Sequence, residues 1–205
     1  MNNIDLKIKV CGLTLQDNID GVDFLDIDFV GNIFYSKSPR YITSNLNSKA
    51  IKVGVFVKET IKTIKTKIEK HDLKVVQLHG WESNEFCNLV KQLGVHVWKV
   101  FSIDDEFNFE LLNEFESADL FLFDTKSPKH GGTGKKFNWE LLNKIDDLSP
   151  KKYFLSGGIG FKDINEIKKL QLKNMIGLDL NSKFEKSPGI KDVELLKEFL
   201  KKLRD

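Results

Sequence analysis

Cys11 ends a short segment in which polar and apolar residues alternate, and its type and position suit a catalytic role. Residues 9–14 read KVCGLT, so Cys11 is followed by a glycine and then by Thr14, a residue type that caps helices. A free cysteine is most often a buried packing residue, but a thiol placed at the end of a strand can also serve in catalysis. The residue alone leaves both interpretations open.

Paired glycines in LSGGIG, residues 155–160, indicate a second kind of chemistry, the binding of an anion. Gly157 and Gly158 carry no side chains, so backbone N–H groups can approach a phosphate closely. Asn181 and Ser182 stand where a short helix is expected to begin, and helix N-termini favour phosphate. The alternative for the glycine pair is a tight turn without a ligand.

Eight apolar segments, rich in β-branched and aromatic residues, would position these side chains. We expect them to be strands, at residues 5–12, 28–34, 50–57, 73–80, 95–103, 118–125, 151–159 and 174–182. Amphipathic segments lie between them, such as residues 58–71, where Ile61, Ile64 and Ile68 repeat with helical spacing. Alternating strands and helices predict a parallel sheet with helices on its faces.

The number of strands favours closure of this sheet. Eight units in 205 residues is about 26 residues per unit, at the short end for a (β/α)8 barrel. The competing architecture is an open doubly wound sheet, but the first strand is followed by CGLTLQD and not by G-x-G-x-x-G. We therefore predict an α/β fold in which residues 1–205 form a single domain, one eight-stranded parallel TIM barrel.

In such a barrel the active site lies at the C-terminal ends of the strands. That edge would collect Cys11, Arg40, Gln77, His79 and Asp124, together with the anion-binding residues. Residues 124–139, DTKSPKHGGTGKKFNW, lack the spacing of a Walker phosphate loop. We expect residues 126–137 to form a loop that moves over the barrel mouth and excludes water.

Composition excludes several classes of protein. The net charge of +2 comes from 32 basic and 30 acidic residues, so we expect neither a nucleic-acid nor a membrane partner. The polar N-terminus MNNIDLKIK is unlike a signal peptide, and Cys11 and Cys87 form no C-x-x-C pair, which together predict a cytoplasmic protein. The histidines are scattered, which argues against a structural zinc site. Cys87, within a helical segment, is expected to be inert.

Six separated motifs resemble, in order and spacing, those of the phosphoribosylanthranilate isomerase family. They are KVCGLT, FYSKSPRYI, VQLHGWE, LFDTKSPKHGGTGKKFNW, LSGGI and GLDLNSKFEKSPGIKD. The resemblance extends from the first strand to the last helix and implies a (β/α)8 barrel enzyme of tryptophan biosynthesis. The implied reaction is an Amadori rearrangement, which converts N-(5-phosphoribosyl)anthranilate into 1-(2-carboxyphenylamino)-1-deoxyribulose 5-phosphate.

The resemblance implies an acid and a base, with no metal and no cofactor. Asp124 would be the acid that protonates the furanose ring oxygen, and Cys11 the base that removes the C2 proton. An aspartate that acts as an acid near pH 7 needs a raised pKa. A cysteine that acts as a base must be partly thiolate, which a nearby positive charge or a helix starting at Thr14, with Asp17 three residues on, would favour.

The resemblance also implies how a phosphorylated small molecule would be bound. The implied residues are Arg40 for the anthranilate carboxylate, Gln77 and His79 along the pocket, and Gly157, Gly158, Asn181 and Ser182 for the sugar phosphate. The planar guanidinium of Arg40 suits a carboxylate, although the alternative for this residue is an ordinary surface arginine. For the assembly we expect a monomer or a homodimer.

Asp179, in the eighth predicted strand, is the rival carboxylate of the site. We count it among the substrate-binding residues, and the alternative is a structural ion pair inside the barrel. Lys9 shares strand parity with Cys11, so it is expected to point inward and to pair with Asp179.

Some residues depart from the usual pattern of the family, and other functions stay open beside it. Asn32 and Asp26 stand where an apolar residue and a glycine are commoner, and Asn181 where a small hydroxyl residue is frequent. The alternatives are another sugar-phosphate barrel enzyme, such as indole-glycerol-phosphate synthase or ribulose-phosphate epimerase, and a non-catalytic phosphate-binding barrel. The presence of both Cys11 and Asp124 favours the isomerase.

Overall fold

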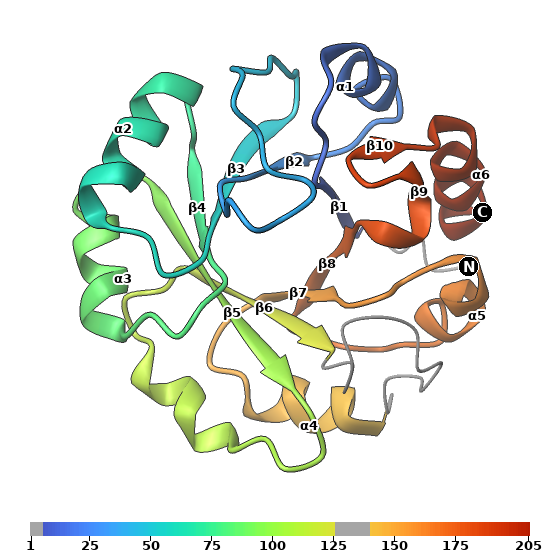
Figure 1. Ribbon diagram of the computed structural model, residues 1–205. Helices are drawn as coiled ribbons and strands as arrows, with labels where there is room; N and C mark the ends of the chain where they lie inside the picture. The colour runs from blue at the N-terminus through green and yellow to red at the C-terminus, as the bar shows by residue number, and fades with distance from the viewer. Residues whose placement is uncertain (1–5, 126–139) are drawn as a thin grey trace.

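The computed structural model describes residues 6–125 and 140–205. Eight parallel strands pair in chain order and close into a barrel, which confirms the predicted architecture (Figure 1). The strands are β1 Lys7–Cys11, β2 Phe29–Ile33, β3 Ile51–Phe56, β4 Val75–Leu78, β5 His96–Ile103, β6 Leu120–Thr125, β7 Tyr153–Ser156 and β8 Met175–Leu180. Each lies within a segment predicted to be a strand.

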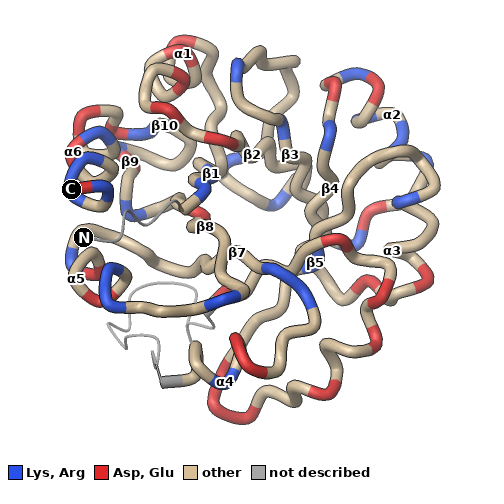
Figure 2. Tube along the Cα trace, turned by 180° about the vertical axis from the view of Figure 1, so that it is seen from behind, with Lys and Arg blue, Asp and Glu red and all other residues tan. Residues whose placement is uncertain are grey.

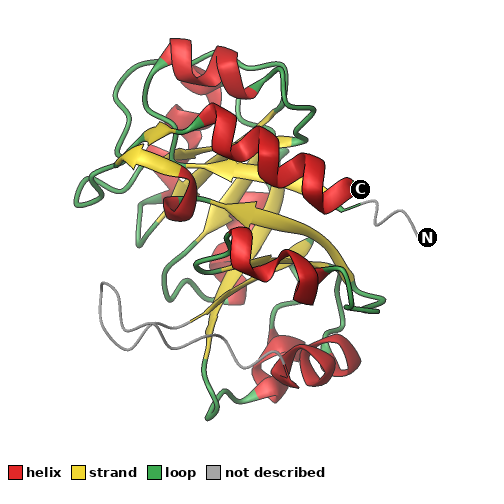
Figure 3. Ribbon diagram, turned by 90° about the vertical axis from the view of Figure 1, so that its right-hand side faces the viewer, coloured by secondary structure: helices red, strands yellow, loops and turns green. Residues whose placement is uncertain are grey.

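Helices surround this barrel (Figures 1 and 3). They are α1 Gln16–Val22, α2 Ile61–His71, α3 Asn84–Lys91, α4 Glu140–Leu148, α5 Ile164–Ile167 and α6 Val193–Arg204, with 3-10 helices η1 Phe109–Glu114, η2 Phe161–Asp163 and η3 Ser182–Phe184. The side chains of Thr60, Ser83 and Asp192 cap α2, α3 and α6 by accepting a backbone N–H from the first turn. Within the described ranges, no helix has the length and apolar character that crossing a membrane requires.

The strict alternation of strands and helices was wrong between β2 and β3. Residues 34–50 form turns and bends instead of a helix. Pro39 restricts the backbone there, and serine and asparagine side chains compete for backbone hydrogen bonds that a helix would use. The Oγ atom of Ser38 accepts such a bond from the backbone N–H of Arg40, at 3.1 Å. This turn therefore fixes the position of the Arg40 backbone from which the side chain extends.

Side chains that point into the barrel change from apolar to polar along the strands. In the amino-terminal halves of β2, β5 and β7, the rings of Phe29, Trp98 and Phe154 pack together, with centroids 4.9 Å apart for Phe29–Trp98 and 5.1 Å apart for Trp98–Phe154. Because side chains alternate along a strand, Gln77 follows Val75 on the inward face of β4, and Asp124 follows Leu122 on that of β6. The polar inward side chains therefore gather at the carboxyl ends. The larger apolar cluster fills the space between strands and helices.

A short antiparallel hairpin follows β8 and was not predicted. Strand β9, Glu185–Ser187, pairs with β10, Ile190–Lys191. The backbone N–H of Thr14 donates to the carbonyl of Gly189, so the hairpin is linked to the segment after β1. In Figure 1 it lies beside α1 and α6. Figure 2 shows lysine, arginine and acidic residues along the outer helices, consistent with the mixed surface charge of the sequence.

Candidate active site

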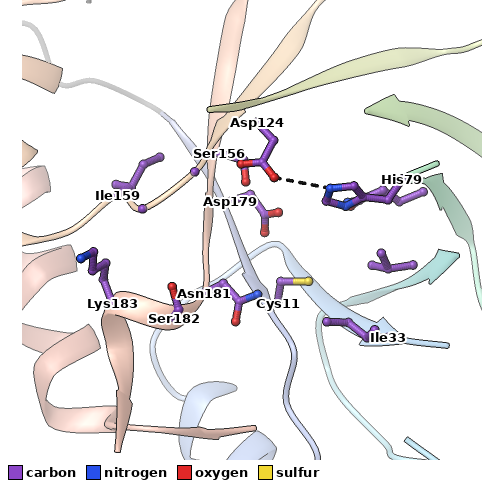
Figure 4. Close-up of a pocket in the computed structure, with 14 residues that line it drawn as sticks. Cys11, Ile33, His79, Asp124, Ser156, Ile159, Asp179, Asn181, Ser182 and Lys183 are labelled. Atoms are coloured by element: carbon purple, nitrogen blue, oxygen red, sulfur yellow. Dashed lines mark hydrogen bonds and ion pairs between the residues drawn. The ribbon is translucent and has the colours of Figure 1, made fainter. Parts of the chain in front are cut away.

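A pocket opens at the carboxyl ends of the strands (Figure 4). Nine of the ten predicted site residues line it: Cys11, Gln77, His79, Asp124, Gly157, Gly158, Asp179, Asn181 and Ser182. The tenth, Arg40, is not part of this lining. In Figure 4, Asn181 and Ser182 lie on one side of the pocket and His79 on the other. The barrel thus brings together residues that are up to 171 positions apart in the sequence (Cys11 and Ser182).

Cys11 is the last residue of β1, and its buried side chain borders the pocket. In the parallel pairing of β1 with β2, its register partner is Gly31. A Cβ atom added to Gly31 would lie 2.5 Å from the Sγ of Cys11, closer than atoms normally approach. The missing side chain at Gly31 therefore provides the space for the thiol.

The predicted ion pair between Lys9 and Asp179 is confirmed. Lys9 Nζ donates to Asp179 Oδ1 at 2.8 Å, and both side chains are buried. Burial opposes the charge on Lys9, but the negative charge of Asp179 holds the Lys9 pKa above its ordinary value. Burial raises the pKa of Asp179, although Lys9 opposes this. The buried ammonium group of Lys9 therefore lies on the same inward face of β1 as Cys11, two residues earlier in the strand.

Burial raises the pKa of the Cys11 thiol above its ordinary value, while the charges of Lys9 and Lys191 act in the opposite direction. The expected help from a helix starting at Thr14 was wrong, because α1 begins at Gln16 and Leu15 precedes it without a side-chain cap. The Oγ of Thr14 instead donates to the carbonyl of Gly189, at 3.1 Å. Lysine side chains, and not a capped helix terminus, supply the positive charge near the thiol.

Asp124 lies on β6 beside a histidine of β4. The Oδ2 atom of Asp124 is 3.4 Å from His79 Nε2 (Figure 4), and Gln77 Nε2 is 3.4 Å from His79 Nδ1. In the orientation drawn, the Gln77 amide donates to Nδ1, so the Nε2 of a neutral His79 carries the proton that faces Asp124. The imidazole is therefore placed to orient the carboxyl group of Asp124.

The loops after β7 and β8 carry the residues predicted to bind an anion. Gly157 and Gly158 have φ angles of 95° and 68°, in the left-handed region that glycine adopts readily. Ser182 begins the short helix η3 and Asn181 precedes it, as the sequence predicted. Lys183 also lines the pocket and was missed, although its position directly after Ser182 was an available signal. The paired glycines, the start of η3 and one lysine thus line the same pocket.

Arg40 is paired with an acidic residue that sequence reasoning did not identify. Its guanidinium donates to both carboxylate oxygens of Glu185, at 2.8 and 2.5 Å. In the sequence, Glu185 stands out only as an acidic residue a few positions after the end of β8. The predicted mobile loop, residues 126–137, lies outside the residues that the structure describes.

The profile of the family described as N-(5'phosphoribosyl)anthranilate (PRA) isomerase matches residues 8–202. This chain belongs to the phosphoribosylanthranilate isomerase family. An N-(5'-phosphoribosyl)anthranilate isomerase of Parabacteroides distasonis is 37% identical in an alignment 206 positions long, which covers 96% of this chain and 92% of that protein.

Solved structures of the family have the same fold. The phosphoribosylanthranilate isomerase of Thermotoga maritima superimposes with a TM-score of 0.83 at 31% identity, over 97% of this chain and 98% of the other. A phosphoribosylanthranilate isomerase in complex with reduced 1-(o-carboxyphenylamino)-1-deoxyribulose 5-phosphate superimposes with a TM-score of 0.81 at 28% identity, with the same coverage. The resemblance found in the sequence motifs is thus confirmed for the family and for the fold.

Proposed function

We propose that this protein converts N-(5-phosphoribosyl)anthranilate into 1-(2-carboxyphenylamino)-1-deoxyribulose 5-phosphate, a step of tryptophan biosynthesis. The observation that carries the proposal is the shared pocket, which is lined by a thiol and a carboxyl group from different strands and by the paired glycines Gly157 and Gly158. An aldose-to-ketose rearrangement needs an acid and a base on one substrate, and this pocket offers one of each beside a place for the phosphate.

Asp124 is the proposed acid. Its carboxyl group gives a proton to the furanose ring oxygen, the bond from that oxygen to C1 breaks, and the nitrogen lone pair forms a protonated Schiff base at C1. The nearby His79 orients this carboxyl group, and we assign neither His79 nor Gln77 a chemical step.

Cys11 is the proposed base. Its thiolate removes the C2 proton, the electrons of that bond form a C1–C2 double bond, and the Schiff base becomes a neutral enolamine that tautomerises to the ketone. Because burial raises the pKa of this thiol, the thiolate fraction below that pKa increases tenfold with each unit of pH. We therefore expect the residual kcat/KM of Asp124→Asn, which lacks the titrating acid, to rise with pH across the neutral range.

Two sets of binding groups are proposed beside this acid–base pair. Gly157, Gly158, Asn181 and Ser182 are proposed to hold the phosphate through backbone N–H groups and the start of η3, with Lys183 adding charge. Arg40, whose side chain lies against Gly12, is proposed to bind the carboxylate of the anthranilate group.

The test is a direct assay in which the substrate is generated in situ and the loss of its fluorescence is followed. Wild type should accelerate the loss, and Cys11→Ala and Asp124→Asn should each reduce kcat/KM by about 10²- to 10⁴-fold. Cys87→Ala is the matched control, because Cys87 is also a buried cysteine but packs in the outer core. It should keep the activity.

The pH dependence separates the proposed base from a packing role. The residual kcat/KM of Asp124→Asn should rise with pH, because only the thiolate of the acid–base pair still titrates, and the residual kcat/KM of Cys11→Ala should show no such rise. If folded wild type does not accelerate the reaction, the non-catalytic phosphate-binding barrel becomes the better interpretation, and titration with phosphate compounds would test it.

A further inference from the structure

The carboxylate of Glu185 is the centre of a cluster of bonds beside the pocket. It accepts two bonds from the guanidinium of Arg40, from Nε at 2.8 Å and from Nη2 at 2.5 Å. It also accepts from Lys191 Nζ at 2.6 Å and from the backbone N–H of Gly189 at 3.1 Å. Its side chain is 5% exposed, so the cluster is largely withdrawn from water. In such surroundings these charge-assisted bonds fix the geometry strongly.

Within residues 6–125 and 140–205, the guanidinium of Arg40 donates only to Glu185, which leaves one of its edges available to a ligand. A guanidinium has five N–H donors in one plane, and Glu185 occupies the edge formed by Nε and Nη2. The edge formed by Nη1 and the second hydrogen of Nη2 can donate two hydrogen bonds to another carboxylate in the same bidentate manner. The Arg40 side chain is 20% exposed, which leaves it accessible to a ligand.

The Arg40 side chain lies against the residue that follows Cys11. A Cβ atom added to Gly12 would lie 2.7 Å from the Cδ of Arg40, so the arginine side chain lies across the residue that follows Cys11. The same added atom would lie 3.1 Å from Oδ1 of Asn181, which lines the pocket. The arginine is therefore adjacent to the pocket without forming part of its lining.

Lys191 is the second cation of the cluster and bonds the same Glu185 oxygen, Oε1, as Arg40 Nε. Its Nζ bridges Glu185 and Oδ1 of Asn181, at 2.6 and 2.7 Å, and its side chain is buried. Its backbone is held by Asn18 through two bonds of 2.7 and 2.9 Å. Two cations share one carboxylate, so the cluster carries a net charge of +1, which favours a bound anion.

We infer that Glu185 is a positioning residue, which holds Arg40 so that its available edge binds the carboxylate of the substrate's aromatic amine. The inference rests on the proposed function for the identity of that carboxylate. Glu185 itself does not touch the substrate. Its effect must therefore pass through Arg40, and this requirement makes the inference testable.

The test combines Glu185→Gln with Arg40→Gln in a double-mutant cycle measured as KM and kcat for N-(5-phosphoribosyl)anthranilate. An amide can replace only one of the two accepting oxygens, and its NH2 group would face the donors of Arg40 or Lys191. We expect each single variant to raise KM about 10-fold or more, with a smaller change in kcat. In the Arg40→Gln background, Glu185→Gln should add less than about 2-fold.

A second substrate distinguishes positioning from a general structural role. The condensation product of ribose 5-phosphate with aniline lacks the carboxylate but keeps the ring, the sugar and the phosphate. Against this substrate, Glu185→Gln and wild type should have the same KM within about 2-fold, because Arg40 has no carboxylate to bind. Loss of local structure would raise KM for both substrates.

Asp146→Asn is the matched control for removing a buried, multiply bonded carboxylate. Asp146 accepts bonds from the Tyr153 hydroxyl and from the backbone N–H groups of Lys173 and Asn174, and it does not line the pocket. It should leave KM unchanged. KM effects of Arg40→Gln and Glu185→Gln that multiply in the double variant, or an equal rise in KM for the aniline substrate, would overturn the inference. An inactive wild type would instead overturn the proposed function.

Discussion

Neutralising only one member of the Lys9–Asp179 pair should destabilise the fold more than neutralising both. The Nζ and Oδ1 atoms are 2.8 Å apart, and the side chains are 0% and 6% exposed. At that distance, with an effective dielectric constant of about 20, Coulomb's law gives an attraction of about 6 kcal/mol. Much of it offsets the free energy that burying the two ions costs. Removing one partner should therefore lower the free energy of unfolding by about 3–5 kcal/mol.

The assay is urea unfolding at pH 7, followed by circular dichroism, for Lys9→Met, Asp179→Leu and the double variant. Met and Leu keep much of the volume and carry no charge. We expect the double variant to lose less stability than either single variant, because no unpaired charge is left inside the barrel. Independent effects would sum to about 6–10 kcal/mol, which is comparable to the whole stability of a typical domain.

An exposed pair with similar geometry provides the control for this cycle. Lys74 Nζ lies 2.7 Å from Asp72 Oδ1, with side chains 63% and 71% exposed. Its coupling energy should stay below about 1 kcal/mol, because water screens the charges. Costs that simply add at Lys9 and Asp179, or equal coupling energies in the two cycles, would refute the reasoning that burial makes the inner pair interdependent.

Two further predictions concern buried groups on either side of the barrel wall. Burial lowers the pKa of His71 from 6.5 to about 4. Between these pH values the unfolded chain binds a proton that the folded chain excludes. The free energy of unfolding should therefore fall by up to about 3 kcal/mol as the pH decreases from 6.5 to 4. His71→Leu should abolish this loss in urea unfolding measured at each pH, whereas His96→Leu, at an exposed histidine, should retain it. Gly31→Ala should displace the thiol of Cys11, because the new Cβ would lie 2.5 Å from Sγ. We expect a cost of about 1–3 kcal/mol in stability and a loss of at least about 10-fold in kcat/KM, and unchanged kinetics in a folded variant would contradict that placement.

The strands were predictable because each is buried on both faces. Strands of a parallel barrel are covered by helices outside and by side chains inside, so they read as short apolar runs that stand out from charged helices. In a (β/α)8 barrel the carboxyl ends of the strands meet at one face, where the active site lies. Cys11, Gln77 and Asp124 stand at or near such ends, so their presence in one pocket was predictable. The parity of Lys9 with Cys11 likewise predicted its inward direction.

The predictions from sequence were wrong or incomplete mainly where a residue bonds to a partner far away in the chain instead of following its local structural preference. Thr14 has the type and spacing of a helix cap, but its hydroxyl bonds to Gly189, which is 175 residues away. The hairpin β9–β10 that carries Gly189 has only 3 and 2 residues in its strands, too short for a periodic signal. The helix expected between β2 and β3 failed for a local reason, since Pro39 and polar side chains favour turns.

The contacts that organise the site share one topological cause, the closure of the barrel. Arg40–Glu185 and Lys9–Asp179 join residues 145 and 170 positions apart, and each connects the beginning of the chain with β8 or the hairpin after it. Those contacts require β1 to pair with β8, which occurs in a closed barrel, where Lys9 and Asp179 are register partners. In an open sheet without that pairing, Lys9 and Arg40 would lose their carboxylates. Choosing the barrel from eight apolar segments therefore already implied that the first and last strands build one site, although it did not identify Glu185.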